Sequence, residues 1–298
     1  MSKLWRCNLK TSSSKNIDPA KFCIENGIVG IGWKLDQAPT SKEDYWEQAR
    51  IAYKAFGRSW SAAANVLLYR MQVDDLVWSR NSKAQYFLGR IVSDWEYSDS
   101  QKHLDADVIN FRKCHWVKVG TVDNVPGSVV NSFIPSATVQ AVNDATAKNY
   151  SKILFNEHSP QEIFEIEPFQ NPDILSLLSD EDLEDAVGIF LQIYKNYVLF
   201  PSTCKSDTQF VEFILRSRSG DQTAGVQVKS GKVPLNPEDY LGFEETVYLF
   251  AASGKYGPSV ENTVCLNPDT IRDFILSNVQ LLPKRIQRWV RAFNNCAS

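Results

Sequence analysis

The sequence predicts an α+β protein with two domains: a strand-rich N-terminal half, and a C-terminal half in which helices flank a mixed sheet. Three observations support this fold class. Val211, Phe213 and Leu215 are apolar and alternate with Glu212, Ile214 and Arg216, which is the two-residue period of a half-buried strand. Apolar residues recur at helical spacing from Leu183 to Tyr194. Seven of the eight tryptophans lie within the first 116 residues, so the two halves differ in composition.

The N-terminal half is expected to consist mainly of strands with a few helices. Residues 28–33 form an apolar run typical of a buried strand, and residues 41–56 open with the acidic residues of a first helical turn. Successive strands of a curled sheet are predicted at residues 77–79 and 86–92, and a further strand at residues 111–119.

The C-terminal half begins with a predicted helix that Ser179 caps, followed by acidic residues that favour a helix N-terminus. A strand at residues 197–200 comes next, and then a β-hairpin whose turn is Ser219-Gly220-Asp221. A strand at residues 246–251 and a helix opened by Asn267-Pro268-Asp269 complete the pattern. This order of elements suits a mixed sheet flanked by helices.

The boundary between the halves is expected in a polar stretch with two prolines. Glu157-His158-Ser159-Pro160 and Phe169-Gln170-Asn171-Pro172 mark that stretch. The predicted domains are therefore residues 1–150 and 174–298, joined by a linker at residues 151–173. At 298 residues the chain is long enough for two cores.

Composition narrows the functional classes. A formal net charge of −3 argues against a generic polyanion binder, and six singly placed cysteines argue against a disulfide framework. No apolar run approaches the length of a membrane span, so a cytoplasmic protein with no membrane partner is expected.

Gly225 to Lys232 resembles a Walker A loop but has one residue too many, and Val233 stands where Ser or Thr is required. Three scattered histidines give no zinc or HNH site.

The hairpin carries the most informative polar residues. Gln227 and Lys229 share one face of its second strand, and Glu212 on the first strand is expected roughly opposite Lys229. Phosphodiester cleavage requires a hard cation, a positioned water and charge relief at the phosphate. A carboxylate with amide or backbone oxygens can hold magnesium, and a lysine can stabilise the phosphate or help deprotonate the water. An exposed polar strand face is the structural alternative.

In these residues the chain resembles the PD-(D/E)XK nuclease superfamily, in particular its Mrr-like restriction branch. The resemblance runs from about Leu183 to Asn278. It implies a restriction-endonuclease-like α/β fold and a magnesium site, with manganese as a possible substitute. The family's usual hairpin Asp is Glu212 here, and Asp207 is a rival for that ligand position. The motifs that carry the resemblance are Glu184, Pro201-Ser202, Glu212 and Val226-Gln227-Val228-Lys229-Ser230-Gly231. The resemblance implies that Glu184, Glu212, Gln227 and Lys229 form the catalytic and metal-binding site.

The first half resembles the PUA-like family of small β-barrels, especially the EVE-type readers fused to restriction nucleases. The family's usual Gly-Asp before the central strand is Asp74-Asp75 here. The resemblance covers roughly residues 3 to 142 and implies a pocket for a flipped, modified base, read by stacking and by polar contacts. Core packing is the alternative role for each tryptophan. The matching residues include Ile31-Gly32-Trp33, Trp60, Tyr69-Arg70-Met71, Val77-Trp78-Ser79, Phe87-Leu88-Gly89-Arg90-Ile91, Trp95-Glu96-Tyr97 and Arg112-Lys113-Cys114-His115-Trp116. The residues implied for the pocket are Trp33, Trp60, Trp78, Ser79, Asn65 and Tyr97.

A basic cluster near the C-terminus is the candidate contact for DNA phosphates. On a helix, Lys284, Arg288 and Arg291 would share a face, with Arg285 beside them. A solvated helix end with favourable cations is the alternative.

Together these features predict a modification-dependent DNA endonuclease. The first domain would flip and read a modified base, with modified cytosine expected, and the second would cut double-stranded DNA as a homodimer. Three alternatives remain: a non-catalytic nucleic-acid-binding protein with a decayed nuclease fold, a reader of RNA, and a structure-specific repair nuclease.

Overall fold

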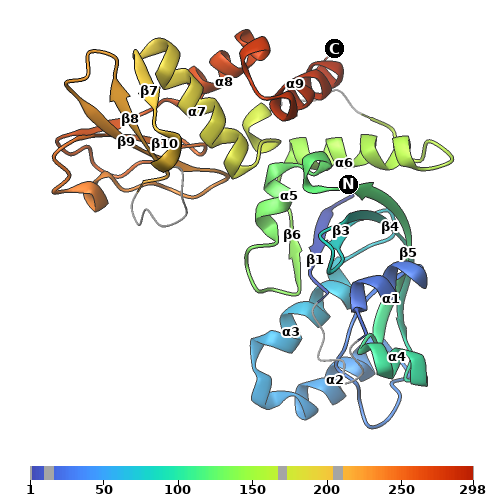
Figure 1. The fold of residues 1–298 in the computed structure, drawn as a ribbon. Helices are drawn as coiled ribbons and strands as arrows, with labels where there is room; N and C mark the ends of the chain where they lie inside the picture. Colours follow the sequence, from blue (N-terminus) through green and yellow to red (C-terminus); the bar gives the residue numbers. More distant parts are fainter. Residues whose placement is uncertain (1, 10–16, 167–172, 204–210, 298) are drawn as a thin grey trace. The chain divides into compact units, whose positions relative to one another are not determined.

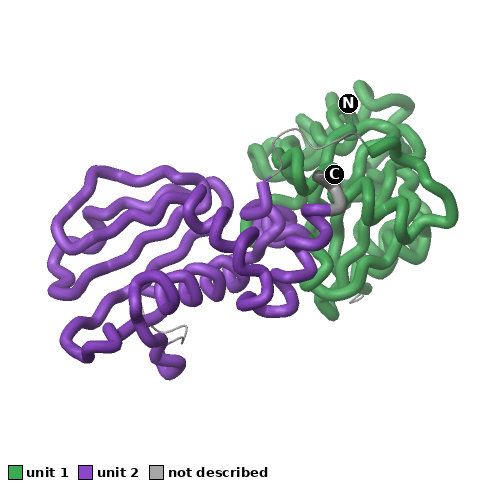
Figure 2. The backbone as a smooth tube through the Cα atoms, turned by 90° about the horizontal axis from the view of Figure 1, so that it is seen from above, with its two compact units in different colours: residues 1–125, 132–167 green, residues 126–131, 168–298 purple. Residues whose placement is uncertain are grey.

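The computed structural model describes residues 2–9, 17–166, 173–203 and 211–297. The chain divides into two compact units (Figure 2). The first unit comprises residues 1–125 and 132–167, and the second comprises residues 126–131 and 168–298. Both units combine a mixed sheet with helices, so the predicted α+β class is confirmed.

The first unit is built on a six-stranded sheet with the order β2-β5-β4-β3-β1-β6. β1 pairs with β3 in parallel and the other pairs are antiparallel. The predicted strands are present, but the sheet is open: among the described residues, no pairing joins the edge strands β2 and β6. The expected closed barrel is therefore wrong for this sheet. The strands are β1 (Leu4–Cys7), β2 (Ile28–Ile31), β3 (Leu76–Arg80), β4 (Tyr86–Tyr97), β5 (Asn110–Gly120) and β6 (Val139–Ala141).

Short helices accompany this sheet (Figure 1). They are α1 (Pro19–Glu25), α2 (Lys42–Ala52), α3 (Arg58–Asn65), α4 (Gln101–Ala106) and α6 (Ala145–His158). The Ser41 hydroxyl caps α2 by accepting a hydrogen bond from the Asp44 amide at 3.1 Å. α6 contains residues 151–158, which the sequence analysis placed in the linker.

The second unit is built on a five-stranded sheet with the order β11-β10-β9-β8-β7. β7, β8 and β9 are antiparallel, whereas β9, β10 and β11 run parallel, so the predicted mixed sheet is confirmed. The strands are β7 (Tyr197–Leu199), β8 (Phe213–Ser217), β9 (Thr223–Lys229), β10 (Thr246–Ala251) and β11 (Thr263–Cys265).

Three longer helices and one short helix complete this part of the chain. They are α5 (Gly127–Ser132), α7 (Asp180–Tyr194), α8 (Pro268–Ser277) and α9 (Lys284–Ala297). Ser179 and Asp182 form a capping box at the start of α7, and Asn267 caps α8, as predicted. α7 runs alongside the sheet and contacts β7 and β9 (Figure 1). None of the described helices is long and apolar enough to span a bilayer.

Candidate functional site

The β8–β9 hairpin forms with the predicted turn but with a shifted register. Gly220 adopts a φ of 81°, a left-handed conformation that glycine takes without strain. Phe213 pairs with Val226, and the Glu212 amide donates to the Val226 carbonyl at 2.8 Å. Glu212 therefore lies beside Gln227, two residues from Lys229, the residue it was expected to lie roughly opposite.

Three of the predicted catalytic residues nevertheless meet at this hairpin. The Gln227 Nε2 donates to Glu212 Oε1 at 2.5 Å, and Lys229 Nζ lies 3.3 Å from the same oxygen. Both side chains reach Glu212 because alternate residues of β9 point to the same face. Lys229 is 42% exposed and Glu212 31%, so the ion pair is open to solvent.

The fourth predicted residue, Glu184, approaches the cluster from α7. The pKa of the Glu184 carboxyl is raised to about 7, mainly by burial and then by the negative charge of Glu212, with smaller contributions from Asp180 and other acids of the helix. α7 contacts β9, the strand that carries Gln227 and Lys229. Glu212, Gln227 and Lys229 are thus in direct contact, and Glu184 lies on the helix that packs against their strand.

This site offers the ligand set of a hard divalent cation. Two carboxylates and one side-chain amide provide oxygen ligands, and a cation between Glu184 and Glu212 would offset their repulsion. Among the described residues, no group of three His, Cys, Asp or Glu side chains forms a metal site, so Gln227 would have to contribute. Asp207, the rival ligand, lies outside the described residues.

Replacing Glu184 with Gln is expected to stabilise the fold above neutral pH. The folded-state pKa of about 7 lies above the ordinary value of 4.5, so the unfolded chain ionises first and stability falls as pH rises between these values. The Gln variant escapes this loss. Because Glu184 is only partly buried, we expect a gain of about 1–2 kcal/mol at pH 8.

Urea unfolding at pH 4 and pH 8 measures this effect. The two proteins should differ at pH 8 and agree at pH 4, and added Mg²⁺ should stabilise the parent protein more than the variant. A variant that is less stable than the parent at pH 8 would contradict the assignment of Glu184 to a repulsive pair of carboxylates.

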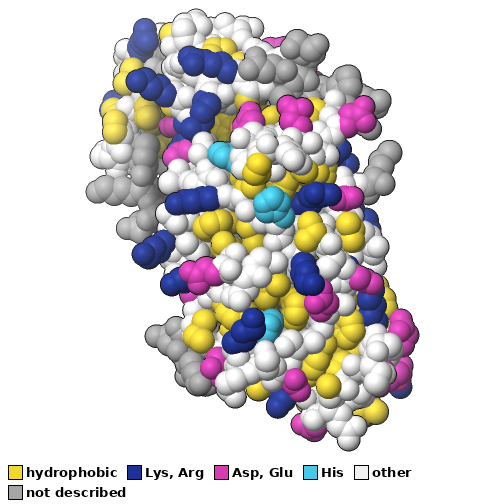
Figure 3. Space-filling view, turned by 90° about the vertical axis from the view of Figure 1, so that its right-hand side faces the viewer, with side chains coloured by type: hydrophobic (Ala, Val, Ile, Leu, Met, Phe, Trp, Pro, Cys, Tyr) yellow, Lys and Arg dark blue, Asp and Glu magenta, His cyan; other side chains and the backbone are white. Residues whose placement is uncertain are grey.

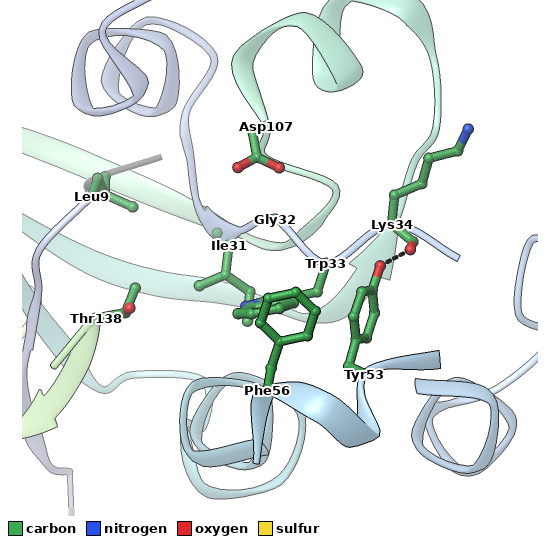
Figure 4. A pocket seen from close by; sticks show the side chains of 10 residues that line it. Leu9, Ile31, Gly32, Trp33, Lys34, Tyr53, Phe56, Asp107 and Thr138 are labelled. Atoms are coloured by element: carbon green, nitrogen blue, oxygen red, sulfur yellow. Dashed lines mark hydrogen bonds between the residues drawn. The ribbon is translucent and has the colours of Figure 1, made fainter. Parts of the chain in front are cut away.

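The first unit contains a separate cavity of about 430 Å³ (Figure 4). Three aromatic rings, of Trp33, Tyr53 and Phe56, line one side, and the Asp107 carboxylate lies on the opposite side. The Trp33 ring meets the Tyr53 and Phe56 rings edge-on, at centroid distances of 5.0 and 5.4 Å. The remaining lining residues are Leu9, Gly30, Ile31, Gly32, Lys34 and Thr138.

The backbone that presents Trp33 is firmly held. Trp33 has a φ of 70°, a left-handed conformation that is unusual for a large side chain. The Tyr45 hydroxyl donates to the Trp33 carbonyl at 3.0 Å, and Asn110 Nδ2 donates to the Gly32 carbonyl at 2.7 Å. A Cβ on Gly32 would lie 2.3 Å from Asp107 Oδ1, so only glycine permits this approach. Backbone strain held in place by its surroundings is a common feature of ligand sites.

Of the six predicted pocket residues, only Trp33 lines this cavity. Trp78 is fully buried, and its Nε1 donates to the Ser151 hydroxyl at 3.0 Å, so it belongs to the core. Trp60 is also buried, with its ring 5.1 Å from that of Trp46. The prediction that Trp60 and Trp78 are pocket walls is therefore wrong.

The three smaller candidates also lie elsewhere. Ser79 is fully buried beside Trp78, and Asn65 is exposed at the end of α3. The Tyr97 hydroxyl accepts a hydrogen bond from the Leu35 amide at 3.1 Å, and its ring packs on Trp95. None of these three lines the cavity, whereas Tyr53, Phe56 and Asp107 do and were not predicted. An aromatic residue directly before a glycine, Phe56-Gly57, is the one local signal that could have drawn attention to this site.

In the basic cluster on α9, Arg285 is engaged in ion pairs, whereas the other three side chains are exposed. Arg285 pairs with Asp182 and, at 3.2 Å, with Glu181. It therefore anchors α9 to α7, and its phosphate contact stays a prediction. Lys284, Arg288 and Arg291 are exposed, as a phosphate contact requires. Both signs of charge occur on the face that Figure 3 shows, in keeping with the net charge of −3.

Comparison with protein families finds one similarity. Residues 5–142 match the model of a domain of unknown function, DUF8426. Comparisons with curated proteins and with solved structures gave no match. The matched stretch contains Trp33, Tyr53, Phe56 and Asp107, so the cavity falls within it.

Proposed function

We propose that the chain is a modification-dependent DNA endonuclease that works in the cytoplasm. In this proposal the first unit is a PUA-like reader of a modified base, and the second is a nuclease of the PD-(D/E)XK type. The observation that carries the proposal is the contact of Glu212 with Gln227 and Lys229 at the β8–β9 hairpin, with Glu184 on α7, the helix that contacts β9.

Each residue of the site has a role in phosphodiester hydrolysis. Glu212 and Glu184, with the Gln227 side-chain oxygen, would hold the cation, and Mg²⁺, or Mn²⁺ in its place, would supply Lewis-acid activation of the phosphate and its water when bound. The Lys229 ammonium, whose Nζ lies 3.3 Å from Glu212 Oε1, is the group that would stabilise the negative charge developing on the phosphate. Since each chain provides one such centre, cutting both strands of a duplex requires a homodimer on the DNA.

The cavity of the first unit is the proposed base pocket. A flipped base can stack on aromatic rings, which contributes about 1–3 kcal/mol per base. Asp107 faces these rings across the cavity, and a carboxylate accepts a hydrogen bond from the exocyclic amino group of cytosine. Aromatic stacking with an opposing carboxylate therefore favours a modified cytosine.

Cleavage of matched plasmids tests this function. We expect the protein with Mg²⁺ to linearise plasmid that carries modified cytosine and to leave the unmodified plasmid intact. In Trp33→Ala, loss of one stacking surface should lower cleavage of the modified plasmid by about 5–150-fold, which corresponds to about 1–3 kcal/mol.

Two comparisons make the test specific. Ile51→Ala, at an exposed residue outside the cavity, should cut the modified plasmid at the parent rate. Competition with RNA oligonucleotides distinguishes an RNA reader, and flapped DNA distinguishes a repair nuclease. Equal cutting of modified and unmodified plasmid would remove the reader role, and binding without any cutting would leave a nucleic-acid-binding protein.

A further inference from the structure

Residues 126–131 belong to the second unit, although the chain before and after them belongs to the first (Figure 2). We infer that this segment, here named the clasp, holds the catalytic elements of the second unit in place. Its residue Asn131 is a positioning residue for Lys229, a role that rests on the proposed function.

One end of the clasp is fixed to the chain that leads into α7. The Gly127 amide donates to the Leu177 carbonyl at 3.0 Å. A Cβ on Gly127 would lie only 1.8 Å from the Leu178 carbonyl oxygen, so no other residue fits here without moving the backbone. Leu178 directly precedes Ser179, which caps the helix that carries Glu184.

The other end of the clasp is fixed to the end of β9. Asn131 Nδ2 donates to the Ser230 hydroxyl at 2.6 Å, and Ser230 is only 9% exposed. Ser230 directly follows Lys229, whose carbonyl accepts a hydrogen bond from the Ala252 amide at 2.8 Å. The backbone at Lys229 is thus held by its pairing with the end of β10, and the clasp holds the side chain of the next residue, Ser230.

The clasp therefore connects the two elements that carry the site. α7 supplies Glu184, and β9 supplies Gln227 and Lys229. Lys229 is the last residue of its strand, and Ser230, which the clasp holds, is the next residue along the chain. A misplacement of about 1 Å can lower a rate by about 10²-fold, so a single hydrogen bond at this point has a measurable effect on catalysis.

A double-mutant cycle tests this role. Asn131→Ala should lower the single-turnover cleavage rate about tenfold without changing KM, because Lys229 acts on the phosphate in the transition state. Ser230→Ala should have the same effect, and the double variant should be no slower than either single one. Ser230→Thr, which keeps the hydroxyl, should restore most of the rate.

The clasp also supplies its own control. The Ser128 hydroxyl is buried and has no hydrogen-bond partner among the described residues, so Ser128→Ala should cleave at the parent rate. If Asn131→Ala fails to fold, Ser230→Ala removes the same hydrogen bond from the other side. Additive rate losses in the double variant, or a loss in Ser128→Ala as large as in Asn131→Ala, would overturn the assignment.

A second measurement is independent of cleavage. The ¹³Cε resonance of Lys229, assigned with Lys229→Arg, should shift in Asn131→Ala and Ser230→Ala and stay in place in Ser128→Ala. If no DNA is cut but this shift occurs, the proposed function fails while the positioning role stands. An unchanged Lys229 resonance in Asn131→Ala would overturn the positioning role whether or not DNA is cut.

Discussion

Lys229→Ala is expected to lower the rate of DNA cleavage by about 10³-fold while leaving the fold intact. Removal of one preorganised group that stabilises transition-state charge costs about 3–4 kcal/mol. Lys229 is the only one of the four site residues with a positive charge, and its Nζ lies 3.3 Å from Glu212. Because this ion pair is partly exposed to solvent, its loss should change the free energy of unfolding by less than about 1 kcal/mol.

Single-turnover cleavage and urea unfolding, measured on the same preparations, separate these two effects. Lys232→Ala is the matched control, because Lys232 is exposed three residues further along the chain. It should retain the full rate. Lys229→Arg keeps the charge on a longer side chain and should recover part of the activity. Full activity in Lys229→Ala would show that the cluster around Glu212 is not the catalytic site.

The second unit could be predicted from its sequence because its signals are local. The capping residues of α7 and α8 and the turn at Gly220 each lie within a few residues of what they control. The alternation of β9 places Gln227 and Lys229 on one face whatever the exact register. A shift in the hairpin therefore changed which residue faces Glu212 without dispersing the cluster.

The base pocket could not be predicted because the role of each tryptophan depends on distant contacts. Trp78 faces Ser151, which lies 73 residues further along the chain, and no local pattern indicates this contact. The cavity combines Trp33, two residues that follow α2, and Asp107 after α4. Arg285 pairs with Asp182, which lies 103 residues earlier in the chain. No local pattern indicates this pair, so the sequence could not show that Arg285 anchors α9 to α7.

The largest loss of stability is expected for Asp75→Ala, at about 3–5 kcal/mol. Asp75 is 2% exposed, and its carboxylate accepts hydrogen bonds from the Lys3 amide, the Trp5 Nε1 and the Gln72 amide at 2.7, 2.7 and 3.0 Å. Removing it leaves these donors without their charged acceptor, and each unsatisfied buried donor costs about 1–3 kcal/mol. Urea unfolding of the full chain measures the loss, which should appear as a lower midpoint for the first unit.

The adjacent acid provides a matched contrast. Asp74 has a φ of 70° and forms an ion pair with Arg90 at 2.6 Å, with the Asp74 side chain 54% exposed. Asp74→Gly relieves the left-handed strain and loses a surface ion pair, two effects of about 1 kcal/mol or less that oppose each other. It should leave stability nearly unchanged. Equal destabilisation by both substitutions would show that Asp75 is not the anchor of this turn.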